Sequence, residues 1–231
     1  MTNTLHRFGK PADLKDDYIV FLMTRKGIND IGAVEKAQEF LRVAKKYNPV
    51  NFAGEHSFGS AFRPEKHLNL FSLYFQGRKE TVALEKVVAE MEPPGRALVV
   101  FDNKPALEGF LKELKEIDLG ISVNVSSLAE DIREMSPRTG LPPHSINYAL
   151  GFSGNLYRLP DEHVLAITTM CGHGLISSGF ARKMLDRVKE GRLTPEKAAG
   201  YLAKFCVCGA FNTSRAARIL RQARTMTPAG V

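Results

Sequence analysis

Over its first 135 residues, the chain alternates between short apolar runs and segments in which apolar residues recur at helical spacing. Residues 18–23 form a continuous apolar run, YIVFLM, which is typical of a strand buried on both faces. A predicted helix follows at 33–47, where apolar residues recur three or four positions apart. The same patterns predict further strands at 68–75, 96–101 and 120–125, and further helices at 80–92, 105–117 and 128–135. This alternation predicts an α/β fold, or a ferredoxin-like α+β fold, in which helices cover a sheet.

Residues 136–143, SPRTGLPP, are the strongest candidate for a boundary, because three prolines and a glycine should not continue a helix or a central strand. We therefore expect an α/β domain over 1–135 and a mainly helical segment over 144–231, and the two could pack as one domain. In the second part we expect a helix at 145–150, a glycine-rich loop at 151–160, a strand at 163–170, and helices at 178–190, 195–204 and 214–224. No internal repeat is apparent in the sequence.

All three cysteines lie in the last third of the chain, in the motifs Cys171-Gly-His173-Gly and Cys206-Val-Cys208-Gly. An odd number of cysteines with this spacing is a poor disulfide framework. In an extended segment, side chains two positions apart can point at one centre, and the following glycine permits a tight turn that leaves amide N–H groups free to bond sulfur. Three thiols and an imidazole are suitable ligands for a soft metal or an iron–sulfur cluster. The sequence therefore predicts a metal site in the C-terminal segment.

The spacing of the motifs favours an iron–sulfur cluster over zinc. Structural zinc sites usually have two to four residues between paired cysteines. Three cysteines can instead hold a [4Fe–4S] cluster and leave the fourth iron for His173 or for a substrate. His173 is thus expected to be a fourth ligand or a group that transfers protons beside the metal. Zinc remains the alternative, and a metal-free thiol redox protein using Cys206 and Cys208, or inert buried cysteines, are further possibilities.

Two loops rich in glycine and aromatic residues provide candidate substrate contacts. One contains His56 and Arg63, and the other contains Asn155 and Arg158, shortly before the first cysteine motif. Loops of this length often bind ligands, and these polar side chains could bind a carboxylate or phosphate.

The expected function is that of a metal-dependent enzyme that acts on a small anionic substrate, by an elimination of the lyase or hydratase type or by desulfuration. The alternative is a structural zinc protein that binds a partner or nucleic acid through a basic helix.

The chain carries a net charge of +7, and its densest basic stretch contains Arg215, Arg218, Arg221 and Arg224. These arginines recur every three residues of a predicted helix, so we expect them to share a broad face. No nucleic-acid-binding motif accompanies them, which favours a solvated face or an anionic small substrate over nucleic acid.

No apolar run approaches the roughly 20 residues needed to cross a bilayer, and the N-terminus lacks the apolar stretch of a secretory signal. We therefore expect a cytoplasmic protein without a membrane partner, which could form a homo-oligomer.

Overall fold

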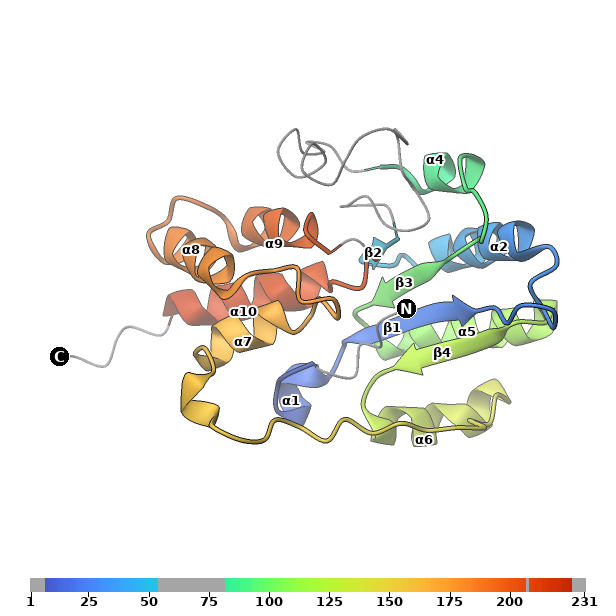
Figure 1. The fold of residues 1–231 in the computed structure, drawn as a ribbon, viewed down its shortest axis with the longest axis horizontal. Coiled ribbons are helices and arrows are strands. Elements are labelled where there is room, and N and C mark those ends of the chain that lie inside the picture. The colour runs from blue at the N-terminus through green and yellow to red at the C-terminus, as the bar shows by residue number, and fades with distance from the viewer. Residues whose placement is uncertain (1–6, 54–81, 207, 226–231) are drawn as a thin grey trace.

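The computed structural model describes residues 7–53, 82–206 and 208–225, and its N-terminal half is built on a four-stranded antiparallel sheet (Figure 1). The strands are β1 (Tyr18–Met23), β2 (Asn51–Phe52), β3 (Leu98–Phe101) and β4 (Ser122–Ser126), and their order in the sheet is β2-β3-β1-β4. The central strand β1 pairs with β3 on one side and with β4 on the other. Its continuous apolar run is explained by this position, because five of its six residues are buried.

Two long helices connect strands that are not neighbours in the sheet. Helix α2 (Ala33–Lys45) leads from β1 to β2, and α5 (Lys104–Ile117) leads from β3 to β4. In each case a third strand lies between the connected pair, so the sheet consists of two interleaved β-α-β units, as in ferredoxin-like folds. The Phe110 ring of α5 packs against Phe40 of α2 and Phe101 of β3, with centroid distances of 5.0 and 5.2 Å. The expected sheet covered by helices is therefore confirmed.

The smaller elements of this half are α1 (Pro11–Leu14), α4 (Leu84–Ala89) and α6 (Ala129–Thr139). Helix α4 is shorter than the helix expected at 80–92, and the short strand β2 was not expected. The strand expected at 68–75 lies outside the described residues.

Helix α6 extends beyond the end expected at 135, because it runs through Pro137 to Thr139 with Gly140 as its C-cap, and so it enters the segment 136–143 that was expected to break a helix. Pro137 cannot donate a helical hydrogen bond, and the contacts of this last turn offset that loss, because Met135 and Thr139 are buried and Arg138 pairs with Glu108 of α5. The helix expected at 145–150 is absent. Those residues form an irregular, exposed segment, and without a buried face a helix gains little stability.

The C-terminal part is helical. It contains the 3₁₀ turn η1 (Leu156–Arg158) and the helices α7 (Glu162–Thr168), α8 (Ser178–Lys189), α9 (Pro195–Ala203) and α10 (Thr213–Thr225). The bounds of α8, α9 and α10 agree with the predicted bounds to within one residue at each end. The strand predicted at 163–170 is wrong, because this segment is α7. Four consecutive apolar residues of α7 are buried, and periodicity cannot distinguish such a run from a strand.

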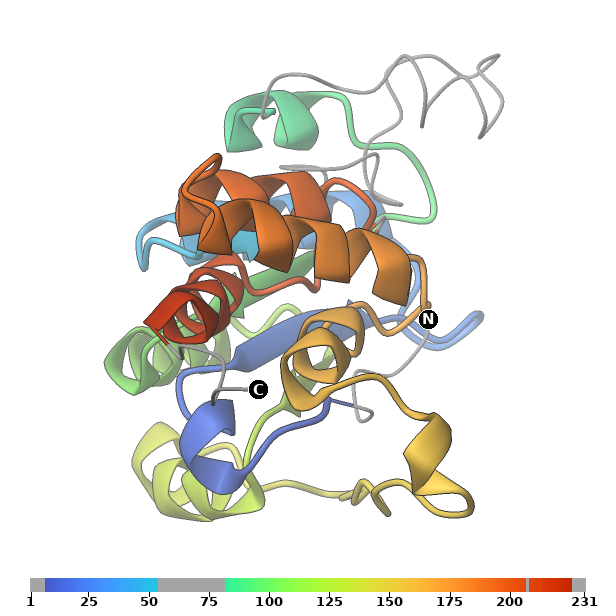
Figure 2. The same cartoon turned by 90° about the vertical axis from the view of Figure 1, so that its left-hand side faces the viewer.

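The four C-terminal helices lie together beside the sheet, at the end where β1 begins (Figures 1 and 2). One hydrophobic core cluster includes residues of both parts. The side chain of Asn51 donates to the carbonyl of Phe211 at 2.8 Å, and the hydroxyl of Thr213 donates to the carbonyl of Val50 at 3.0 Å. Of the helices that the structure describes, none combines the length and the apolar character that a membrane span requires.

Candidate thiol site

Cys171 and Cys206 occupy equivalent positions after two different helices. Each is the third residue beyond the last residue of its helix, α7 for Cys171 and α9 for Cys206. Their amide N–H groups donate to Thr168 and Ala203, at 3.3 and 2.9 Å, and so continue the helical turns. Both side chains are directed into the protein and are buried.

A glycine closes the turn that follows each cysteine. Gly174 donates its N–H to the carbonyl of Cys171 at 3.0 Å, and Gly209 donates to that of Cys206 at 3.1 Å. Both glycines have left-handed backbone angles, with φ of 65° and 73°. Gly209 also has no room for a side chain, because a Cβ there would lie 2.5 Å from the backbone of Phe52.

The structure brings the three thiols together. The Sγ atoms of Cys206 and Cys208 are 3.8 Å apart, and Cys206 also hydrogen-bonds to Cys171. Cys206 is completely buried and hydrogen-bonds to both of the other thiols. The two motifs, which are separated by α8 and α9, therefore form one buried cluster.

Hydrogen bonds give the three thiols different acidities. Hydrogen bonds with Cys206 lower the pKa of Cys171 and of Cys208 to about 6, against the opposing effect of burial. Amide N–H groups of His173 and Leu175 help to lower the pKa of Cys171, and that of Ala210 acts in the same way on Cys208. The pKa of Cys206 is raised by its hydrogen bonds to the other two thiols and by burial. Of the three thiols, Cys206 is therefore the least acidic.

His173 lies on the exposed side of the cluster. Its imidazole contacts Cys208 and contributes, through its charge and a hydrogen bond, to the lowered pKa of that thiol. As the side chains stand, no set of three or more His, Cys, Asp or Glu residues in the described part of the chain is arranged to hold a metal ion. The thiols hydrogen-bond to one another instead.

The other predicted site residues are not seen at this cluster. Asn155 and Arg158 are exposed in and beside η1, which precedes α7, whereas Cys171 follows the other end of that helix. Helix α7 has seven residues and is about 10 Å long, and it lies between these two residues and Cys171 along the chain. His56 and Arg63 lie outside the described residues.

The arginines of α10 do not form a uniformly solvated face. Arg215 is completely buried and pairs with Asp17 at 3.0 Å. Arg221 is exposed and pairs with Glu196 of α9. The expectation of a shared solvated face is therefore wrong for Arg215, because this side chain belongs to a buried ionic cluster at the start of β1.

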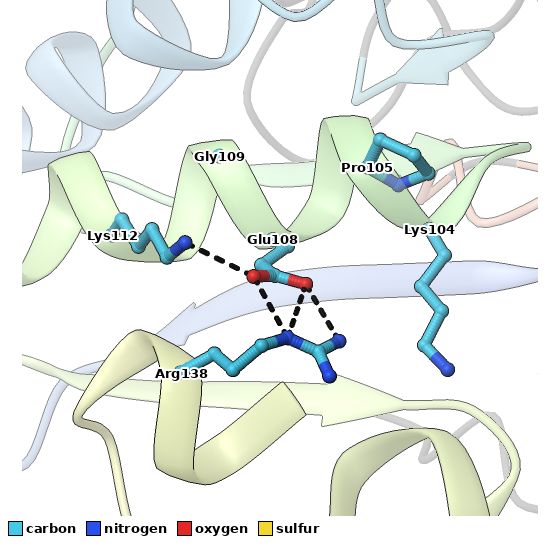
Figure 3. A pocket seen from close by; sticks show the side chains of 6 residues that line it. All are labelled: Lys104, Pro105, Glu108, Gly109, Lys112 and Arg138. Carbon is cyan, nitrogen blue, oxygen red and sulfur yellow. Dashed lines mark hydrogen bonds and ion pairs between the residues drawn. The ribbon is translucent and has the colours of Figure 1, made fainter. Parts of the chain in front are cut away.

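A hollow of about 380 Å³ lies between α5 and α6 (Figure 3). Its lining residues are Lys104, Pro105, Glu108, Gly109, Lys112 and Arg138. Arg138 and Lys112 both bind the Glu108 carboxylate, and Lys104 binds Asp131 and Glu134 of α6. These cations are already paired with carboxylates. The residues around the hollow are therefore better explained as a network of ion pairs that joins the two helices than as an anion-binding site.

No protein-family model, curated protein or solved structure matches this chain. The geometry of the thiol cluster is therefore the main basis for a functional proposal.

Proposed function

We propose that this chain is a metal-dependent enzyme whose metal is bound by Cys171, Cys206 and Cys208 and whose substrate is a small anion. The observation that supports the proposal is the meeting of three buried thiols from two turns that are distant in sequence. An inert core cysteine needs no such partners, whereas a soft metal needs several thiolates around one point.

The surroundings of the thiols also support a ligand role. A thiol must lose its proton to bind a metal, and donated amide N–H groups stabilise the resulting thiolate. Such donors reach both Cys171 and Cys208. Metal binding would replace the hydrogen bonds that now join the thiols.

We favour a [4Fe–4S] cluster as the metal group, because three cysteines leave one iron for His173 or for a substrate. An open iron would supply a Lewis acid for an elimination of the lyase or hydratase type, or for a desulfuration. His173, on the exposed side, would bind that iron or move a proton. Arg158, Asn155, Arg63 and His56 remain candidates for contacts with the charged substrate.

Structural zinc is the second candidate, and one distance favours it. Two thiolates on a tetrahedral zinc with bonds of about 2.3 Å are ~3.8 Å apart. The Sγ atoms of Cys206 and Cys208 have this separation, 3.8 Å. Thiolates on two separate irons of a cluster would lie farther apart. The same short distance is compatible with a redox dithiol formed by these two cysteines.

Anaerobic purification, followed by a visible spectrum and by analysis of iron, sulfide and zinc, separates these candidates. Bound iron and sulfide with a brown colour support the cluster, and one zinc per colourless chain supports the structural site. Cys206→Ser should abolish metal retention, whereas the buried control Ala37→Ser in α2 should retain it. A chain that holds neither metal, even after reconstitution under reducing conditions, contradicts both. Reversible loss of two titratable thiols on oxidation would then favour the dithiol.

A further inference from the structure

The helical hairpins α7–α8 and α9–α10 share one local plan. In each hairpin the first cysteine is the third residue after the first helix, and a glycine with positive φ follows three residues later. The second helix begins seven residues after the cysteine, at Ser178 in one hairpin and Thr213 in the other. The two turns therefore have the same length and the same position of every element.

The hydrogen bonds of the two turns also correspond. Each glycine N–H donates to the carbonyl of the cysteine, at 3.0 and 3.1 Å. Each second helix is capped by the residue before it, since Ser177 accepts from the N–H of Phe180 and Asn212 accepts from that of Arg215. The agreement extends from the end of one helix to the first turn of the next.

This correspondence aligns residues 171–178, CGHGLISS, with residues 206–213, CVCGAFNT. Only the first cysteine and the glycine are identical, which explains why the repeat is not evident from the sequence. Ile176 and Phe211 are both buried at equivalent positions. Leu175 and Ala210 also correspond, although their amides donate to thiols at different positions of the motif, Leu175 to Cys171 and Ala210 to Cys208. In this alignment His173 is equivalent to Cys208.

We propose that His173 is a metal ligand in the position that Cys208 occupies in the other hairpin, so that each hairpin contributes two ligands to one four-ligand centre. This inference rests on the proposed metal centre and selects, of its two arrangements, the one in which His173 rather than a substrate occupies the fourth ligand position. His173 lies two residues after Cys171, as Cys208 lies two residues after Cys206, and its imidazole is among the groups that act on the Cys208 thiol. Imidazole and thiolate are interchangeable ligands in tetrahedral sites of the Cys3His type. His173 would close the centre on its exposed side.

Cobalt(II), added alone to the reduced chain after removal of any bound metal, is a suitable probe, because thiolate-to-cobalt absorption reports the number of sulfur ligands. We expect one cobalt per wild-type chain and at least tenfold weaker binding by His173→Ala. His173→Cys should bind tightly, with the sulfur-derived absorption increased by about one third, from three thiolates to four. Cys208→His should bind with that absorption decreased by about one third. The control is His144→Ala, another exposed histidine, which should behave as the wild type.

The outcomes separate this inference from the function on which it rests. Wild-type affinity in His173→Ala, together with unchanged absorption in His173→Cys, would show that His173 is not a ligand and would leave a three-thiolate centre intact. Absence of cobalt binding by the wild type would overturn the four-ligand centre, whereas the analysis of iron, sulfide and zinc described above tests the metal-dependent function separately. Circular dichroism of each variant checks folding, and because His173 is exposed, His173→Cys provides a test that does not create a cavity.

Discussion

At the scale of single residues, Gly209 connects the thiol cluster to the sheet. The left-handed backbone at this position closes the turn after Cys206, and the absent side chain lets the turn approach the backbone of Phe52. The sequence suggested that a glycine was needed for the turn. It could not identify Phe52 as a neighbour, because that contact depends on how the two parts of the chain pack.

Gly209→Ala should therefore destabilise the protein by more than about 2 kcal/mol, since it adds a backbone clash to the strain of a left-handed residue. Gly191→Ala is the matched control, with a φ of 71° but nothing within 4 Å of the added carbon, and should cost about 1 kcal/mol. Urea unfolding measures both free energies. If both variants lost the same free energy of unfolding, the close approach to Phe52 would not contribute to the cost of Gly209→Ala.

At the scale of elements, the success of sequence reasoning depended on local signals. Helix α9 was predictable because Thr194 and Pro195 form a strong helix start, and the Thr194 hydroxyl accepts from the N–H of Lys197. Helix α7 was predicted as a strand because its buried run has no polar face. Its start is nevertheless fixed by Asp161, which accepts from the N–H of Val164 at 3.0 Å. The meeting of the two cysteine motifs depends on the packing of four helices, which no local pattern reveals.

Removing the cap of α7 should cost about 1 kcal/mol in Asp161→Ala, because one N–H of the first helical turn would lose its partner. Asp161→Asn should cost less than about 0.5 kcal/mol, since asparagine caps helices nearly as well. The pair of Asp161 with Arg182 is exposed and adds little to this difference. Thermal or urea unfolding of both variants provides the comparison, and equal losses would mean that the ion pair, rather than the cap, is important.

The contact between α5 and α6 predicts a pH dependence. Hydrogen bonds from Arg138 and Lys112 lower the pKa of Glu108 from 4.5 to about 2. A carboxyl with a lowered pKa in the folded state stabilises the protein above its ordinary pKa, and this stabilisation is lost as the pH falls from about 4.5 toward about 2. The free-energy difference between the wild type and Glu108→Gln should thus be constant from neutral pH to about 5.5 and should shrink below about 4.5. A difference that stays constant down to pH 4 would contradict this assignment.

At the scale of the whole molecule, a buried ionic cluster joins the N-terminal segment, the sheet and the C-terminal helices. The Asp17 carboxylate, just before β1, accepts hydrogen bonds from Arg7, Arg215 and Asn212, at distances between 2.8 and 3.0 Å. Arg7 also donates to the carbonyl of Ala210, the residue whose amide donates to Cys208. One carboxylate thus pairs with two guanidinium groups, and Arg7 connects this ionic cluster to the turn that carries Cys208.

This cluster gives the largest stability effect that we expect. Asp17→Asn keeps the shape of the side chain but leaves two buried guanidinium groups without a counter-ion, and should cost about 3–5 kcal/mol. Glu196→Gln, which breaks the exposed pair with Arg221, should cost less than about 1 kcal/mol.

If uncompensated charge is the cause, removing one guanidinium should recover part of the loss. The double variant Asp17→Asn/Arg7→Met should then be more stable than the sum of its single changes, and a double-mutant cycle in urea measures the difference. Protection of the three cysteines from alkylation, followed in the same samples, reports whether the thiol cluster loosens together with the ionic cluster. Strict additivity would show that Arg7 and Asp17 are not coupled.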